Sequence, residues 1–271
     1  MRRLKLLLEY NGSRYHGWQL QPHTLTVQGT LEACLARLTN GPVRLYAAGR
    51  TDAGVHAVGQ VAHFDTASTL ALAALVRGAN SLLPDDIVVR QADDVPAEFH
   101  ARYAARHKTY VYLIHNHTVP SALSAPYCWH VPQALDLAAM RTAARVLLGY
   151  HDFSAFRAAS CAARSPWRRL IRLRLTRRAA RLTVELCADA FLQHMARNIV
   201  GTLVAIGRGR LPAAAMSTIL QAGKRQLAGA TAPAHGLCLL RVVYGDEASS
   251  AESETAPVTA GDTGSGARPR A

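Results

Sequence analysis

The residue types best suited to chemistry lie in one short segment, GRTDAG at residues 49–54. Its two glycines permit backbone angles that other residues resist, so we expect a loop. Asp52 is followed by small residues and would present an accessible carboxylate, with Arg50 on the same side of an extended chain. A guanidinium there stabilises the ionised carboxylate that a nucleophile requires. The segment indicates either a carboxylate nucleophile or an Asx turn beside a surface cation.

A second segment, YNGSRYHGWQ at residues 10–19, interleaves aromatic and basic residues with glycine. Such a loop can hold a phosphate backbone through Arg14 and offer aromatic faces to bases. The alternative is a glycine turn in which Tyr15 and Trp18 are core residues, because tryptophan is often largely buried. The pattern alone leaves both interpretations open.

Two further segments carry one candidate each. In HKTYVYL at residues 107–113, Tyr110 and Tyr112 share one face of a predicted strand, where a tyrosine can stack on a base or fill the core. In FLQHMARNIVGTL at residues 191–203, the apolar positions 192, 195, 199 and 203 form one helical stripe. Arg197 lies off that stripe, so it is either solvated or directed at a carboxylate in a cleft.

A loop of small residues, GATAPAHG at residues 229–236, precedes the last predicted strand, which begins at Leu237. Glycine and alanine leave room for a backbone or a ligand to approach closely. The loop is therefore a candidate part of a binding site.

Hydrophobic periodicity predicts the elements that must position these segments. Strands are predicted at 4–10, 44–48, 60–65, 87–91, 108–115, 170–178, 181–188 and 237–244, and helices at 27–38, 70–80, 135–147, 191–207 and 212–222. The first half reads β-α-β-β-α-β, and the second half is similar. We therefore expect an α+β fold of two similar halves, each a mainly antiparallel sheet with helices on one face. The predicted domains are 1–105 and 106–244.

The charge balance indicates a nucleic-acid partner. The chain of 271 residues has 31 Lys and Arg against 18 Asp and Glu, and all but three of these bases are arginine. Arginine has a planar fork that pairs with phosphate and stacks on bases. Residues 245–271 contain five acids and two bases and almost no large apolar residue, which predicts a disordered acidic tail. Residues 1–244 then have a formal net charge of +16.

Composition also excludes several classes of protein. At 49% hydrophobic residues, the bulk of the chain has enough apolar material for a core. The five cysteines are far apart and form no C-x-x-C pair, so neither a disulfide framework nor a zinc knuckle is expected. No window approaches the roughly 18 apolar residues of a membrane span. We expect a cytoplasmic protein with buried thiols.

Taken together, eight ordered segments between residues 4 and 244 resemble the TruA family of tRNA pseudouridine synthases. They are YNGSRYHGWQLQP, TVQGTLE, GRTDAGVHAVGQVAHFDT, SLLPDDIVV, FHARYAARHKTYVYLI, GYHDFSAF, FLQHMARNIVGTL and APAHGLCLLRVVY. One departure is Ala196, where the family usually has valine. Because Arg197 is retained, we expect altered packing and no loss of function.

The resemblance implies a pseudouridine synthase fold with ferredoxin-like or RRM-like halves, a basic cleft between them and a homodimer that binds tRNA. It implies isomerisation of uridine at positions 38, 39 and 40 of the anticodon stem-loop, with no cofactor and no metal. Asp52 would attack ribose C1′ or uracil C6, and Arg197 would hold it ionised. Tyr110 would stack on the base and help to move a proton. Arg50 would fill the space that the flipped uridine leaves; Arg14 and Leu237 would contact substrate.

Three other functions compete with this interpretation. A zinc deaminase would need an H-x-E motif near P-C-x-x-C, and neither occurs in the sequence. A glycosidase would need two carboxylates across the bond, and the loop supplies one. A basic RNA-binding protein without catalysis fits the charge and the aromatic residues, and it predicts that Asp52 is dispensable.

Overall fold

The computed structural model describes residues 1–245, and residues 246–271 of the predicted tail lie outside the described residues. The first half contains the predicted order of elements. They are β1 (Arg2–Tyr10), α1 (Val27–Thr39), β2 (Tyr46–Ala47), β3 (His56–Thr66), α2 (Leu72–Leu82) and β4 (Ile87–Val95).

The second half contains every predicted element and two short strands that periodicity did not indicate, β6 and β7. The elements are β5 (Ala105–His115), β6 (Trp129–His130), α3 (Leu137–Val146), β7 (Gly149–Asp152), β8 (Trp167–Arg178), β9 (Arg181–Ala188), α4 (Met195–Gly207), α5 (Ala215–Ala222) and β10 (Leu237–Tyr244). Four single 3-10 turns also occur: η1 (Gly12–Arg14), η2 (Ser154–Phe156), η3 (Arg225–Leu227) and η4 (Ala234–Gly236).

The strands form one continuous sheet, which corrects the expectation of a separate sheet in each half. Its order is β4-β1-β3-β10-β5-β9-β8-β7, with β2 beside β3 and β6 beside β5. The last strand, β10, joins the halves because it pairs antiparallel with β5 and parallel with β3. The division into domains at residues 105 and 106 stays a prediction, since β10 belongs to both sets of strands.

Alternating apolar residues explain why the first strand lies where it does. Leu4, Leu6 and Leu8 are fully buried on one face of β1, as period two requires. The helix α1 begins after Thr26, whose hydroxyl accepts a hydrogen bond from the Gly29 N–H and so caps the first turn. Local sequence signals therefore explain the position of β1 and the start of α1.

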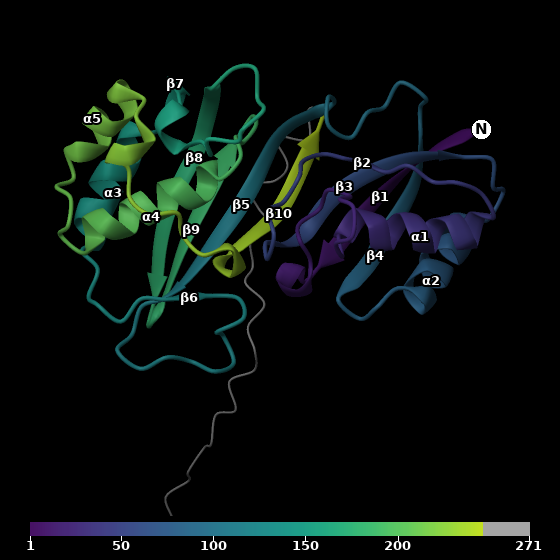
Figure 1. Cartoon of the computed structure of the whole chain (residues 1–271), viewed down its shortest axis with the longest axis horizontal. Coiled ribbons are helices and arrows are strands. Elements are labelled where there is room, and N and C mark those ends of the chain that lie inside the picture. The colour runs from purple at the N-terminus through teal and green to yellow at the C-terminus, as the bar shows by residue number, and fades with distance from the viewer. Residues whose placement is uncertain (246–271) are drawn as a thin grey trace, which may run out of the picture.

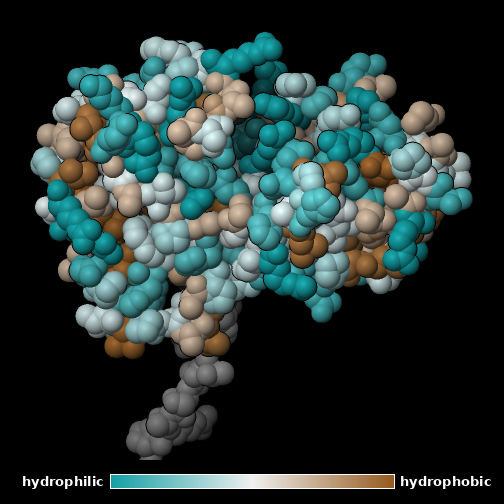
Figure 2. All heavy atoms as spheres, in the orientation of Figure 1, coloured by the Kyte–Doolittle hydropathy of each residue, from teal (hydrophilic) through white to brown (hydrophobic). Residues whose placement is uncertain are grey.

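The helices cover the sheet in two groups (Figure 1). α2 contacts β4 beside α1, and α3 contacts β8 at the other end of the sheet, where it also packs on α4 and α5. Between these groups the surface is hollowed, and hydrophilic side chains gather around the hollow (Figure 2). In the part of the chain that the structure describes, no helix has the length and apolar character to cross a membrane.

Candidate active site

Asp52 lies in the loop between β2 and β3, as the sequence predicts. The Val55 N–H donates to the Asp52 carbonyl at 3.1 Å, and Gly54 has a φ of +78°, which favours glycine. The loop is therefore a tight turn that ends where β3 begins. Its carboxylate remains accessible, since the Asp52 side chain is 23% exposed.

Backbone hydrogen bonds from the segment at residues 10–19 hold this loop in place. The Trp18 N–H donates to the Thr51 carbonyl at 3.0 Å, and the Gly54 N–H donates to the Tyr15 carbonyl at 3.3 Å. Tyr15 and Trp18 are 3% and 2% exposed. They are core residues, as the second of the two interpretations of this segment expects for these rings, and a phosphate contact through Arg14 stays a prediction.

Two buried side chains fix the ends of the loop that carries Asp52. The Tyr10 hydroxyl lies 2.8 Å from the Thr51 hydroxyl. At the other end, His56 Nδ1 accepts from the Gly12 N–H at 3.1 Å, so its Nε2 donates to the His235 carbonyl, also at 3.1 Å. Burial lowers the pKa of His56, and a neutral ring suits both bonds. The motif histidine therefore positions the loop.

Arg197 reaches Asp52 from the first turn of α4. Its Nη1 donates to Asp52 Oδ2 at 2.9 Å, and its Nε donates to the Ala232 carbonyl at 2.8 Å. The Ala232 N–H in turn donates to the Arg197 carbonyl at 3.1 Å. Because the guanidinium is held at two points, it is oriented before any substrate binds. The structure thus brings together the carboxylate and the arginine that the sequence singled out.

The loop before β10 lies directly against α4. A Cβ on Gly201 would lie 1.7 Å from the Ala230 carbonyl oxygen, and a Cβ on Gly229 would lie 2.8 Å from the Thr202 Cα. Only glycine allows this approach. The predicted close contact is therefore one between two backbones, and it places Ala232 where Arg197 can bond to it.

Tyr110 borders the same cavity from β5. Its ring meets Phe191 edge-on at a centroid distance of 4.9 Å, and the residue is 6% exposed. Burial, with smaller contributions from Tyr10 and Asp52, raises the pKa of the phenol well above its ordinary value. Tyr110 is therefore a neutral phenol at physiological pH.

Leu237 and Arg50 also line the cavity, whereas Arg14 does not. Leu237 is 5% exposed and pairs with Tyr112 in the sheet, so it is part of the apolar floor. Arg50 is exposed beside Asp52. Arg14 forms an ion pair with Asp86 at 3.3 Å, outside the cavity.

The cavity has a volume of about 1010 Å³ and is lined by residues of both halves. Asp52 is its single carboxylate among the described lining residues. The cations that line it are Arg44, Arg50, Arg102, Lys108, Arg168 and Arg197. An excess of cations of this size favours a polyanionic ligand.

His194 and Lys108 are two of the lining residues to which the sequence alone gave no role. His194 Nε2 lies 3.6 Å from Asp52 Oδ2, a distance that depends on the left-handed backbone at His194, with φ of 65°. Lys108 is 8% exposed within the strand that carries Tyr110. Each residue lies in a segment that the sequence singled out. Neither the approach of His194 to Asp52 nor the burial of Lys108 follows from residue spacing.

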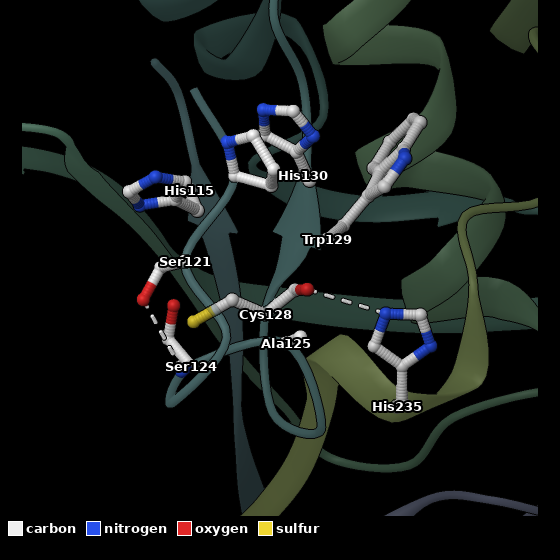
Figure 3. A pocket seen from close by; sticks show the side chains of 9 residues that line it. His115, Ser121, Ser124, Ala125, Cys128, Trp129, His130 and His235 are labelled. Carbon is white, nitrogen blue, oxygen red and sulfur yellow. Dashed lines mark hydrogen bonds between the residues drawn. The ribbon is translucent and has the colours of Figure 1, made fainter. Parts of the chain in front are cut away.

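A second, smaller pocket of about 310 Å³ lies beside β6 and shares no residue with the first (Figure 3). There the His235 Nε2 donates to the Cys128 carbonyl at 3.2 Å. Since the His235 carbonyl accepts from His56, this pocket adjoins the chain of bonds that fixes the Asp52 loop. Within residues 1–245 no group of three or more histidines, cysteines or acids is placed to hold a metal ion.

A carboxylate held by an arginine, beside an aromatic ring in a strongly basic cavity, is an arrangement that suits an enzyme with a polyanionic substrate. The family model described as tRNA pseudouridine synthase matches residues 7–104 and 143–245. The chain therefore belongs to the tRNA pseudouridine synthase family, whose members are isomerases.

Proteins named tRNA pseudouridine synthase A are similar to nearly the whole chain. The one from Geobacter sulfurreducens is 49% identical over 244 residues, which are 90% of this chain and 100% of that protein. The one from Cronobacter sakazakii is 46% identical over 242 residues, 89% of this chain and 90% of that protein. In a solved structure of a Cbf5-Nop10-Gar1 complex, the match to one chain covers 87% of this chain and 57% of that chain. The TM-score is 0.35 and the sequence identity is 11%.

Proposed function

We propose that this chain converts uridine to pseudouridine in the anticodon arm of tRNA, with Asp52 as the nucleophile. In this reaction the bond from uracil nitrogen to ribose C1′ breaks, the base turns, and a carbon–carbon bond to the same C1′ forms. Atoms are neither gained nor lost. One observation carries the proposal: Asp52 Oδ2 lies 2.9 Å from Arg197 Nη1 in a cationic cavity that Tyr110 borders.

Arg197 is proposed to hold Asp52 in its attacking geometry. Because a second bond to the Ala232 carbonyl fixes the guanidinium, the carboxylate is oriented without a reorganisation cost during the reaction. Attack on ribose C1′ and attack on uracil C6 both begin from this geometry. In either case Asp52 is the group that forms the covalent bond.

Tyr110 is proposed to hold the uracil that has left its stack. The ring is pinned by Phe191 and supplies an aromatic face, and its neutral hydroxyl is available to help move a proton. Leu237 offers an apolar contact on the same floor. The exposed Arg50 is proposed to take the place of the flipped uridine in the RNA.

Three further parts of the proposed function concern the path of the RNA, the oligomeric state and the location in the cell. We propose binding of the RNA backbone outside the cavity near Arg14, whose side chain is 70% exposed despite its ion pair. We also propose a homodimer and a cytoplasmic location. The five cysteines are all free thiols, as a reducing compartment favours.

The test is incubation of the purified protein with unmodified tRNA transcript, followed by digestion to nucleosides. Conversion of uridine to a nucleoside of equal mass and different chromatographic mobility would support the proposal. Mapping the modified positions tests the anticodon arm. If product forms equally with Asp52→Ala, the chain acts without this nucleophile and the mechanism is refuted.

A further inference from the structure

Lys108 is a buried cation to which the mechanism above gives no role. It is 8% exposed and lines the cavity that contains Asp52. It precedes Tyr110 by two residues on β5, so both side chains lie on one face of the strand, about 7 Å apart along it. Lysine is almost never buried to this degree without a partner.

Lys108 forms no ion pair within residues 1–245, although the charge of Asp189 acts weakly to raise its pKa. Its neighbours across the sheet are Ala188 in β9 and Val242 in β10. The carboxylate of Asp189 accepts hydrogen bonds from two backbone N–H groups, at 3.1 and 2.6 Å.

Two more cations face the same part of the cavity. Arg102 and Arg168 line it, and neither takes part in an ion pair of the described chain. The Arg168 Nε is buried without a hydrogen-bond acceptor. Burial, together with the charges of Arg102 and Arg168, lowers the pKa of Lys108 to about 8. Repulsion among these like charges destabilises the free protein, and a bound anion would reduce that repulsion.

The stem of Lys108 also passes beside the catalytic loop. A Cβ on Gly49 would lie 3.7 Å from Lys108 Cε and 3.8 Å from its Nζ. The ammonium group therefore lies at the start of the loop that carries Asp52. An anion bound there would lie in the cavity that Asp52 and Tyr110 also line.

We propose that Lys108, with Arg102 and Arg168, binds an RNA backbone phosphate next to the target uridine. The inference rests on the proposed function and deepens it. In a nucleotide the phosphate and the base are separated by one ribose, and the same strand face presents Lys108 and Tyr110 in that order. Holding both ends would fix the ribose between them relative to Asp52.

The experiment compares tRNA binding by Lys108→Met and Lys108→Arg, with Lys224→Met as the matched control. Lys224 is an exposed lysine outside the cavity. Loss of a charge-assisted bond should raise the Kd of K108M for unmodified tRNA roughly 10- to 100-fold. The slope of log Kd against log salt should fall by about 0.7 to 0.9, as expected for one phosphate contact. K108R should restore both quantities, and K224M should match wild type.

The pH profile gives a readout that a structural role would not move. Lys108 loses its proton through the range from pH 7 to 8.5, because burial and the charges of Arg102 and Arg168 lower its pKa to about 8. The Kd of wild type should therefore rise about fourfold across it. K108R should show no such rise, because arginine stays charged. K108M should melt at or above the wild-type temperature, since it removes an isolated buried charge.

Three results would overturn the proposal: a wild-type Kd and salt slope in K108M, the same pH profile in K108R as in wild type, or a lowered kcat in K108M with unchanged Kd. The last result would assign Lys108 to support of the Asp52 loop. If K108M does not fold, the K108R pH profile still decides. If the wild type binds tRNA but does not isomerise uridine, the proposed function is refuted. The Kd comparisons among the Lys108 variants would still test the phosphate site.

Discussion

Gly17→Ala tests whether the segment at residues 10–19 positions Asp52. Gly17 has a φ of +88°, and a Cβ there would lie 2.7 Å from the Thr51 carbonyl oxygen and 3.1 Å from the Asp52 carbonyl carbon. The left-handed backbone costs about 1–2 kcal/mol for an L-residue, and overpacking adds about 1–3 kcal/mol. At about 2–4 °C per kcal/mol, the melting temperature should fall by roughly 5–15 °C.

Activity should fall along with stability. The loop must move by several tenths of an ångström, and a 1 Å misplacement can cost about 10²-fold in rate. We expect single-turnover pseudouridine formation to slow roughly 10- to 100-fold while the Kd for tRNA changes less than about threefold. Gly41→Ala is the matched control, because its nearest atom is 4.0 Å away. A Gly17→Ala enzyme with the wild-type rate would refute this account of the loop.

Three further expectations follow from the site. Arg197→Met removes a charge-assisted bond worth about 1.5–3 kcal/mol, so turnover should drop at least tenfold, with Arg197→Lys in between; equal rates would contradict the ion pair's role. Tyr110→Phe should bind tRNA normally but turn over about 10²–10⁴ times more slowly if its hydroxyl moves a proton. Tyr110→Leu should lose about 1–3 kcal/mol of stacking, and a Leu variant as fast as wild type would remove Tyr110 from the site. Binding of tRNA by the wild type should weaken steeply with salt: in a plot of log K against log salt concentration, each duplex phosphate contact should add about 0.9 to the downward slope. A slope of zero would contradict electrostatic recognition.

Local patterns in the sequence predicted most elements because their signals are local. The alternation of Leu4, Leu6 and Leu8 indicates a strand directly, and the small residues around Asp52 indicate a turn. Boundaries were less accurate. The helix expected from residue 191 begins at Met195, and the strand expected from residue 60 begins at His56. Residues 191–194 line the cavity that contains Asp52, and there tertiary contacts override local propensity.

Long-range placement could not be predicted from spacing. The pairing of β10 with β3 joins residues 238 and 56, and no local pattern encodes it. Arg14 lies outside the cavity, where it pairs with Asp86 across 72 positions of sequence; its contact with substrate stays a prediction. The approach of His194 to Asp52 depends on one left-handed residue at the start of α4. Such contacts join residues far apart in the sequence, so they become visible only in the folded chain.

The most direct test of the account is the single-turnover rate of Asp52→Asn on unmodified tRNA, measured with its Kd. The substitution keeps the size of the side chain and removes the charge that Arg197 holds. We expect no detectable pseudouridine and a Kd within about threefold of wild type, because affinity comes mostly from phosphate contacts. A rate within tenfold of wild type would contradict the assignment of Asp52 as the nucleophile.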